Sequence, residues 1–110
     1  MTVYVDDVFI PAKVGRLDAR WCHMTADTPD ELHAFAARIG LRRSWAQHEG
    51  TWKEHYDVTE GRRAAAVRAG AVEITWREGA AQGKARREGV PFDLATLRAT
   101  SEPTAESRTP

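Results

Sequence analysis

Residues 28–40 carry the strongest local constraint in the chain, because helix signals mark both of their ends. Thr28 suits an N-cap, Pro29 suits the first helical position, and Glu31 completes a capping box three residues after the cap. Gly40 fits the left-handed position that ends a helix. Between these ends, apolar residues recur at helical spacing and form one stripe, at Leu32, Phe35, Ala36 and Ile39. The pattern therefore predicts an amphipathic helix that must pack against another element.

Short apolar and β-branched runs surround this helix and predict strands at residues 2–5, 20–24, 55–58 and 71–76. A second, alanine-rich helix is expected between Thr59, an N-cap candidate, and Gly70. The alternation of strands with helices favours βαβ units. The expected fold is therefore a small α/β sandwich of two or three layers, with a mainly parallel sheet of three to four strands and two main helices.

The 110 residues suffice for one domain with one core. We expect that domain to cover residues 1–77. Residues 78–110 are expected to form a flexible basic and polar tail that has room for one short helix at 93–98. Sixteen basic and sixteen acidic side chains cancel, so no net field draws the whole molecule toward nucleic acid or an anionic membrane.

The sequence also predicts a compartment. No apolar run approaches the ~20 residues of a membrane span, and the N-terminus lacks the basic and apolar regions of a signal peptide. The one cysteine, Cys22, excludes an internal disulfide and lies in an apolar run, where a small buried hydrophobe is expected rather than a nucleophile. These features predict a cytoplasmic protein that does not enter a membrane.

Polar side chains end or follow three of the predicted strands: Asp6 with Asp7, His23, and His55 with Asp57. Because parallel strands end at the same edge of a sheet, where α/β proteins bind their ligands, we expect one polar site there. Asp6 and Asp7 are candidate ligands of a divalent cation such as Mg²⁺, Mn²⁺ or Zn²⁺. The alternative is a plain strand terminus in which one aspartate caps a turn.

Three of the histidines fall in or beside predicted elements, namely His23, His33 and His55. Two-residue spacing on a strand puts His55 and Asp57 on one face, so His23, His55 and Asp57 are the candidate catalytic residues, as ligands or proton shuttles. His33, on the flank of the first helix, is a candidate metal ligand. Each histidine taken alone also fits a satisfied, partly buried side chain, and the sequence contains no paired-cysteine or His-Glu-x-x-His motif.

Arg62 and Arg63 fall in the first turn or so of the second helix, where the helix dipole disfavours cations. An anion at that helix end would explain them, so they are candidate phosphate-binding residues. The alternative is a solvated helix face. The one long loop of the chain contains Trp45, His48 and Trp52. A tryptophan there could stack on a nucleic-acid base or cap the open end of the core.

Several short motifs lie along residues 2–77: Val3-Tyr4-Val5-Asp6-Asp7, Cys22-His23-Met24, Ala26-Asp27-Thr28, Glu31-Leu32-His33 with Ala36 and Ile39-Gly40, His55-Tyr56-Asp57, Arg63, Gly70-Ala71 and Ile74-Thr75. Together they resemble domain-of-unknown-function family 4031, which comprises short proteins of bacteria and their phages. The resemblance implies no activity, because the family has none assigned. The connection from His48 to Lys53 is longer here than in the family, so the resemblance assigns no role to His48.

Two functions stay open at this point. The leading hypothesis is a metal-dependent hydrolase of a phosphoester or nucleotide, with a divalent metal as cofactor and a phosphate-containing small molecule or nucleic acid as partner. The alternative is a non-catalytic module for phage or host interaction or for nucleic-acid binding, in which the histidines and aspartates form a structural network. An exposed sheet edge would also be compatible with a homodimer.

Overall fold

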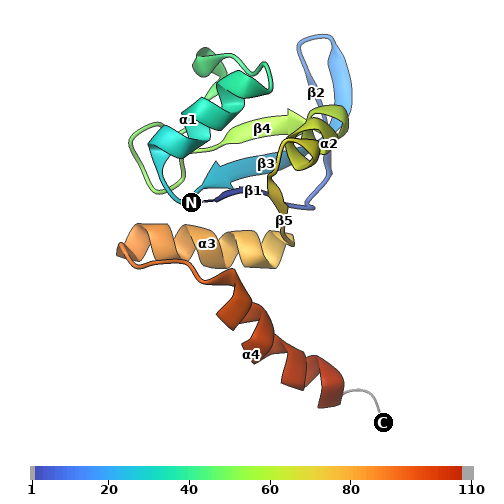
Figure 1. The fold of residues 1–110 in the computed structure, drawn as a ribbon. Coiled ribbons are helices and arrows are strands. Elements are labelled where there is room, and N and C mark those ends of the chain that lie inside the picture. The colour runs from blue at the N-terminus through green and yellow to red at the C-terminus, as the bar shows by residue number, and fades with distance from the viewer. Residues whose placement is uncertain (1, 108–110) are drawn as a thin grey trace.

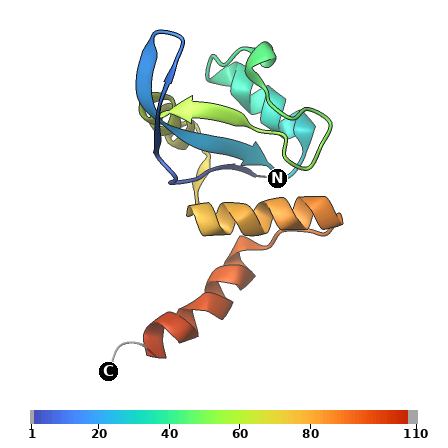
Figure 2. The ribbon, with the colours of Figure 1, turned by 180° about the vertical axis from the view of Figure 1, so that it is seen from behind.

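A computed structural model describes residues 2–107 of the chain, with side chains up to residue 100. The elements follow the order β1 (Val3–Val5), β2 (Ile10–Val14), β3 (Leu17–Ala26), α1 (Pro29–Arg38), the 3₁₀ helix η1 (Arg43–Trp45), β4 (Tyr56–Thr59), α2 (Glu60–Arg68), β5 (Val72–Glu73), α3 (Trp76–Glu88) and α4 (Leu94–Ser107). Helices α1 and α2 lie on one side of the sheet and α3 lies on the other (Figures 1 and 2). The fold is therefore mixed α/β with three layers.

Strand β3 is the centre of the sheet, because every other strand except β5 pairs with it. Met24 pairs with Val5 on one side and with Tyr56 on the other. Trp21 likewise pairs with both Ile10 and Thr59. Strands β1 and β2 therefore lie one after the other along one edge of β3, and β4 lies along the opposite edge.

The prediction of a mainly parallel sheet was wrong. Among the described strands, β1, β2 and β4 all run antiparallel to β3, and the parallel pair is β1 with β5. The physical reason is a hairpin turn at Gly15, which has φ +62° and returns the chain directly from β2 into β3. The predicted strand at 20–24 is the second half of β3, whose first half is polar and exposed and lacks an apolar signal.

The edge formed by β1 and β2 contains a bulge. Val5 is opposite Met24, whereas Ile10 is opposite Trp21, so residues 6–9 on this edge face residues 22–23 of β3. Phe9 has φ +46°, an unusual conformation for a residue with a side chain. Bulges bend a strand and redirect side chains, often next to functional sites.

Both predicted helices are confirmed. The Thr28 hydroxyl accepts from the Glu31 N–H at the start of α1, and the apolar stripe of α1 is buried at Leu32, Phe35 and Ala36. The Thr59 hydroxyl accepts in the same way from the Arg62 N–H at the start of α2. The buried faces of both helices pack in one hydrophobic core with residues of the sheet, namely Val5, Cys22, Met24, Tyr56 and Val58.

Residues 2–107 form four α-helices rather than the two main helices expected. Trp76, predicted to end a strand, begins α3, because Thr75 and Glu78 form a complete capping box. Helix α3 occupies the start of the segment predicted as a flexible tail, and α4 extends from Leu94 to Ser107, beyond the short helix expected at 93–98. The last residues of that tail, 108–110, lie outside the described residues. Of the helices that the structure describes, none combines the length and apolar character needed to cross a membrane.

Tyr4 points toward the α3 layer and gives the fold a measurable dependence on alkaline pH. Its hydroxyl donates to Asp27 Oδ1 at 2.9 Å, and its ring meets Phe92 edge-on. Burial first, and then the Asp27 carboxylate, raise the pKa of Tyr4 from 10.0 to about 12. Between these values the unfolded chain loses the phenol proton and the folded chain keeps it, so the free energy of unfolding falls as the pH rises.

We predict that Tyr4→Phe reduces this alkaline loss of stability, because phenylalanine cannot ionise. The measurement is urea unfolding of both proteins at about pH 8 and about pH 11, at one ionic strength. The remaining slope belongs in part to Tyr56, whose pKa is also raised by burial. Equal losses in the two proteins would contradict the prediction.

Candidate functional site

Three adjacent strands place Asp6, His23 and Asp57 side by side. The Asp6 N–H donates to the His23 carbonyl at 3.0 Å, and His23 pairs with Asp57 across β3 and β4. Cross-strand partners share a face of the sheet. Alternation along β3 turns His23 away from the core face, in which Cys22 and Met24 are buried. The three side chains therefore form a row on the α3 side of the sheet.

His55 joins this row from the loop that precedes β4. It forms an isolated antiparallel bridge with Gln47 and lies two residues before Asp57, so the two side chains share a face, as their spacing predicts. The intervening Tyr56 is buried on the opposite face. The rings of His23 and His55 meet edge to face, with centroids 5.2 Å apart. We call His23, His55 and Asp57, with Asp6 behind His23, the His/Asp cluster.

The cluster does not lie where parallel strands would end, which was its expected position. His23 is in the interior of β3, and His55 precedes β4. The residues meet because antiparallel register aligns positions that are far apart in the chain. The prediction that the site lies at one edge of the sheet was wrong, because β3 runs antiparallel to β1 and β4.

Asp6 fixes the orientation and the tautomer of His23. Asp6 is 6% exposed; its Oδ2 lies 2.7 Å from His23 Nδ1, and its Oδ1 accepts from the His23 backbone N–H at 2.9 Å. A carboxylate only accepts, so His23 Nδ1 carries the proton and Nε2 is left free to act as a ligand. The hydrogen bond with Asp6 raises the pKa of His23 above 6.5, against the opposing effect of burial. Burial works to raise the pKa of Asp6, but the hydrogen bonds from His23 outweigh it and lower that pKa below 3.8.

His55 is oriented in the same manner by a backbone carbonyl. Its Nδ1 lies 2.6 Å from the Lys53 oxygen, which can only accept, so Nδ1 carries the proton. Its Nε2 faces Asp57 Oδ1 at 3.2 Å, and His23 Nε2 lies 4.0 Å from the same oxygen. When His55 Nε2 also carries a proton, its hydrogen bond to Asp57, stronger than the effect of burial, lowers the pKa of Asp57 below 3.8. Two imidazole nitrogens thus converge on one ionised carboxylate.

The converging atoms have the spacing of a metal site. One ligand atom from each of His23, His55 and Asp57 lies within 4.8 Å of the other two. In a tetrahedral zinc site, ligand atoms about 2.1 Å from the ion lie about 3.4 Å from one another. The observed 3.2 and 4.0 Å bracket that value. Small side-chain rotations would therefore bring all three atoms into coordination distance.

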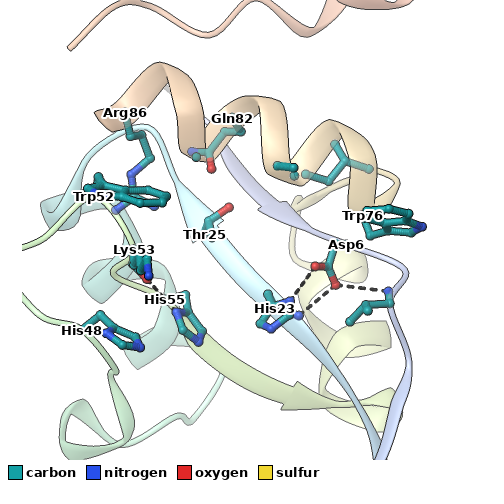
Figure 3. Close-up of a pocket in the computed structure, with 15 residues that line it drawn as sticks. Asp6, His23, Thr25, His48, Trp52, Lys53, His55, Trp76, Gln82 and Arg86 are labelled. Carbon is teal, nitrogen blue, oxygen red and sulfur yellow. Dashed lines mark hydrogen bonds and ion pairs between the residues drawn. The ribbon is translucent and has the colours of Figure 1, made fainter. Parts of the chain in front are cut away.

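The cluster opens into a pocket between the sheet and α3, with a volume of about 340 Å³. His23 and His55 line its floor, and α3 forms its roof (Figure 3). Two cationic side chains, Lys53 and Arg86, stand at the end nearer Trp52. The rest of the lining is largely apolar. A pocket of this size, with a few polar groups in an apolar wall, is typical of small-molecule sites.

The other predicted site residues have other partners. Asp7 accepts from the Trp76 N–H at the start of α3 at 2.7 Å. His33 binds Glu54 through Nε2 at 2.6 Å and the Tyr56 hydroxyl through Nδ1 at 2.8 Å, on the α1 side of the sheet. The structure therefore does not bring Asp7 or His33 to the cluster.

The two arginines at the start of α2 also bind protein groups. Arg62 donates to the carbonyl oxygens of Ile39 and Gly40, where α1 ends. Arg63 donates to the Asp6 carbonyl at 2.7 Å and to Glu73 at 3.0 Å. Neither lines the pocket, so the cations that face it are Lys53 and Arg86.

Several pocket residues were missed by sequence reasoning. Gln82 lies on α3, in the segment predicted as flexible, and the Thr75-x-x-Glu78 capping box was the signal that could have revealed this helix. Arg86 lies on the same helix and was expected only as part of the basic stretch from Lys84 to Arg87, a candidate surface for the non-catalytic module. His48, to which no role was assigned, stacks on His55 with ring centroids 5.7 Å apart. No sequence signal distinguishes Lys53, because its contribution to the cluster is a backbone carbonyl.

Comparison with known proteins gives one match. The model of the family described as "Protein of unknown function (DUF4031)" matches residues 3–86. This span contains the whole His/Asp cluster and continues past residue 77 through Gln82 and Arg86 of α3. Neither the curated proteins nor the solved structures contain a match.

We predict that Asp6→Ala lowers the free energy of unfolding by about 1–3 kcal/mol, because it leaves the His23 backbone N–H without its acceptor. Asp7→Ala is the matched control. It removes a neighbouring but exposed carboxylate and should cost less. Denaturant unfolding measures both variants, and an equal loss in the two would contradict the assignment.

The cost of Asp6→Ala should also depend on pH. The lowered pKa of Asp6 stabilises the fold above pH 3.8, and this contribution is lost as the pH falls through that lowered value. The raised pKa of His23 stabilises the fold below pH 6.5, and this contribution is lost as the pH rises through that raised value. The difference between wild type and Asp6→Ala should therefore be largest between pH 3.8 and 6.5.

Proposed function

The chain belongs to the DUF4031 family of proteins of unknown function, and we propose that it is a hydrolase of a phosphoester or nucleotide that depends on a divalent metal. The proposed ligands are His23 Nε2, His55 Nε2 and the Asp57 carboxylate. Asp6, predicted from the sequence as a ligand, becomes the partner that orients His23. The proposal rests on the geometry of the cluster and on the charge of its pocket.

One observation carries the metal part of the proposal. Both histidines have Nδ1 bound to an acceptor, the Asp6 carboxylate for His23 and the Lys53 carbonyl for His55. Histidine ligands of metals have this arrangement, because the second hydrogen bond fixes the tautomer and leaves the other nitrogen unprotonated. A purely structural network would require a proton on Nε2 of at least one histidine to bind Asp57.

The donor set limits the choice of metal. Two imidazole nitrogens and one carboxylate suit Zn²⁺ or Mn²⁺ better than Mg²⁺, which prefers oxygen ligands. Three protein ligands also leave at least one coordination position free, as in catalytic zinc sites. An ion bound there would polarise a phosphoryl oxygen and lower the pKa of a water molecule.

The pocket supplies the groups that an anionic substrate requires. Arg86 stays cationic although burial lowers its pKa, because guanidinium pKa values are very high. Lys53 places a second cation at the same end of the pocket. These side chains would bind the non-bridging oxygens of a phosphoester and offset the charge that develops on them. The Asp6 carboxylate also lines the pocket but is bound to His23, so the two cations at the other end support an anionic substrate.

We predict that the wild-type protein binds Zn²⁺ or Mn²⁺ at one site, and that His55→Ala and Asp57→Ala weaken this binding by more than about 100-fold. Asp6→Asn, which leaves the ligands but weakens the orientation of His23, should weaken it by about 10–100-fold. Isothermal titration calorimetry on metal-free protein measures each affinity. Asp7→Ala is the control, since this carboxylate lies outside the cluster.

Equal metal affinity in the wild type and in Asp57→Ala would contradict the proposed metal site. The histidines and aspartates would then form the structural network of the alternative, non-catalytic module. Under that alternative, melting temperatures should not respond to any of these metals.

We also predict metal-dependent hydrolysis of bis(p-nitrophenyl) phosphate, a generic phosphodiester. Activity should disappear on chelation and in His23→Ala. Lys53→Met should raise KM while leaving metal affinity unchanged, because the carbonyl that orients His55 belongs to the backbone. Release of p-nitrophenol measures the rate. Hydrolysis that survives both chelation and His23→Ala would show that the cluster is not the source of the activity.

A further inference from the structure

Helix α3 carries a buried side chain with an unused hydrogen-bonding atom, Gln82. It is 1% exposed, its Nε2 donates to the Ala26 carbonyl at 3.0 Å, and its Oε1 has no hydrogen-bond partner among the residues that the structure describes. Turning the amide over would place Oε1 against the Ala26 oxygen, which cannot donate. Gln82 Oε1 is therefore fixed as an acceptor. Buried acceptors are rarely left without a donor, so we expect a bound ligand or water molecule to donate a hydrogen bond to this atom.

The free acceptor belongs to the pocket above the cluster. Gln82, Thr25 and His23 all line it. Figure 3 shows the Gln82 amide extending from α3 toward the sheet, with Thr25 beneath it on β3. A hydroxyl can donate as well as accept. The pocket therefore offers an acceptor and a donor close together, which suits a ligand edge that carries a donor beside an acceptor.

The position of Thr25 relates this polar pair to the His/Asp cluster. Thr25 follows His23 by two residues on the same face of β3, a separation of about 6.6 Å along the strand. An occupant that reaches both would place a polar edge at Gln82 and Thr25 and a second group at the cluster, where the proposed metal and Arg86 favour an anion. The lining also includes Ala80 and Gly83, small residues that leave room for an apolar or planar body.

We propose that this pocket binds a nucleoside monophosphate whose base carries an amino group beside a ring nitrogen, as adenine and cytosine do. The amino group donates to Gln82 Oε1, the Thr25 hydroxyl donates to the ring nitrogen, and the phosphate faces His23, His55 and Arg86. The phosphate part of this assignment rests on the proposed metal-dependent function. The base part rests on Gln82 and Thr25 and is independent of the metal.

The test compares ligands that differ by the amino group. Adenosine 5′-monophosphate and purine riboside 5′-monophosphate, which lacks the amino group, are titrated into the Zn²⁺-loaded protein by calorimetry. Adenosine and purine riboside are titrated with and without Zn²⁺, so that the base is measured apart from the phosphate. The wild-type protein should prefer the amino-bearing member of each pair by about tenfold or more.

Two variants assign the contacts. Gln82→Met, similar in length but without the acceptor, should remove the preference for the amino group. Thr25→Val, similar in shape but without the hydroxyl, should weaken both members of a pair equally and keep the preference. Thermal melting confirms that each variant is folded, and Thr25→Val keeps the test informative if the loss of the bond to Ala26 unfolds Gln82→Met.

The outcomes separate this inference from the proposed function. Zn²⁺ binding without any preference between the paired ligands overturns the inference, leaves Gln82 Oε1 to a water molecule, and keeps the metal site. A preference for adenosine that Gln82→Met removes, in a protein that binds no metal, supports the base contact and overturns the proposed function. Binding of both monophosphates no tighter than inorganic phosphate also overturns the inference.

Discussion

The register of β3 against β1 and β4 decides where the histidines and aspartates of the His/Asp cluster lie. Antiparallel pairing sets His23 opposite Asp57 on one side and beside Asp6 on the other. A shift of one residue would turn His23 into the core and Cys22 into the pocket. The core holds this register, because Met24 and Tyr56 pair with each other and are both fully buried on the opposite face. Packing of the core on the α1 and α2 side of the sheet thus fixes the positions of the His/Asp cluster on the α3 side.

The bulge opposite residues 22–23 serves the same arrangement. Ending the regular pairing of β1 at Val5 leaves the Asp6 carboxylate free to turn back onto the His23 backbone and ring. Arg63 supports the turn by donating to the Asp6 carbonyl, and its guanidinium lies over the Phe9 ring at 5.1 Å. The irregular segment 6–9 therefore positions Asp6 in the His/Asp cluster.

What could be predicted from the sequence was local. The caps of α1 and α2 and the shared face of His55 and Asp57 follow from spacing within a few residues. Strand direction could not be predicted, because it depends on the Gly15 turn and on a polar first half of β3 that carries no apolar signal. Helix α3 could not be predicted because its glycines suggested a flexible segment. Gly83 instead lies against the Trp52 ring, where an added Cβ would be only 3.4 Å from a ring atom. A residue that suggested flexibility instead allows a close contact.

Residue 54 joins parts of the molecule that are otherwise separate layers. The Glu54 side chain is 2% exposed and binds His33 of α1, while its carbonyl accepts from Arg86 of α3. The same residue lies between Lys53 and His55 in the chain. The loop around Glu54 is therefore bound on both sides of the sheet. It cannot unfold locally without breaking the contacts of Glu54 with both His33 and Arg86. Slow hydrogen exchange in this loop would report the cooperative unfolding of the whole domain.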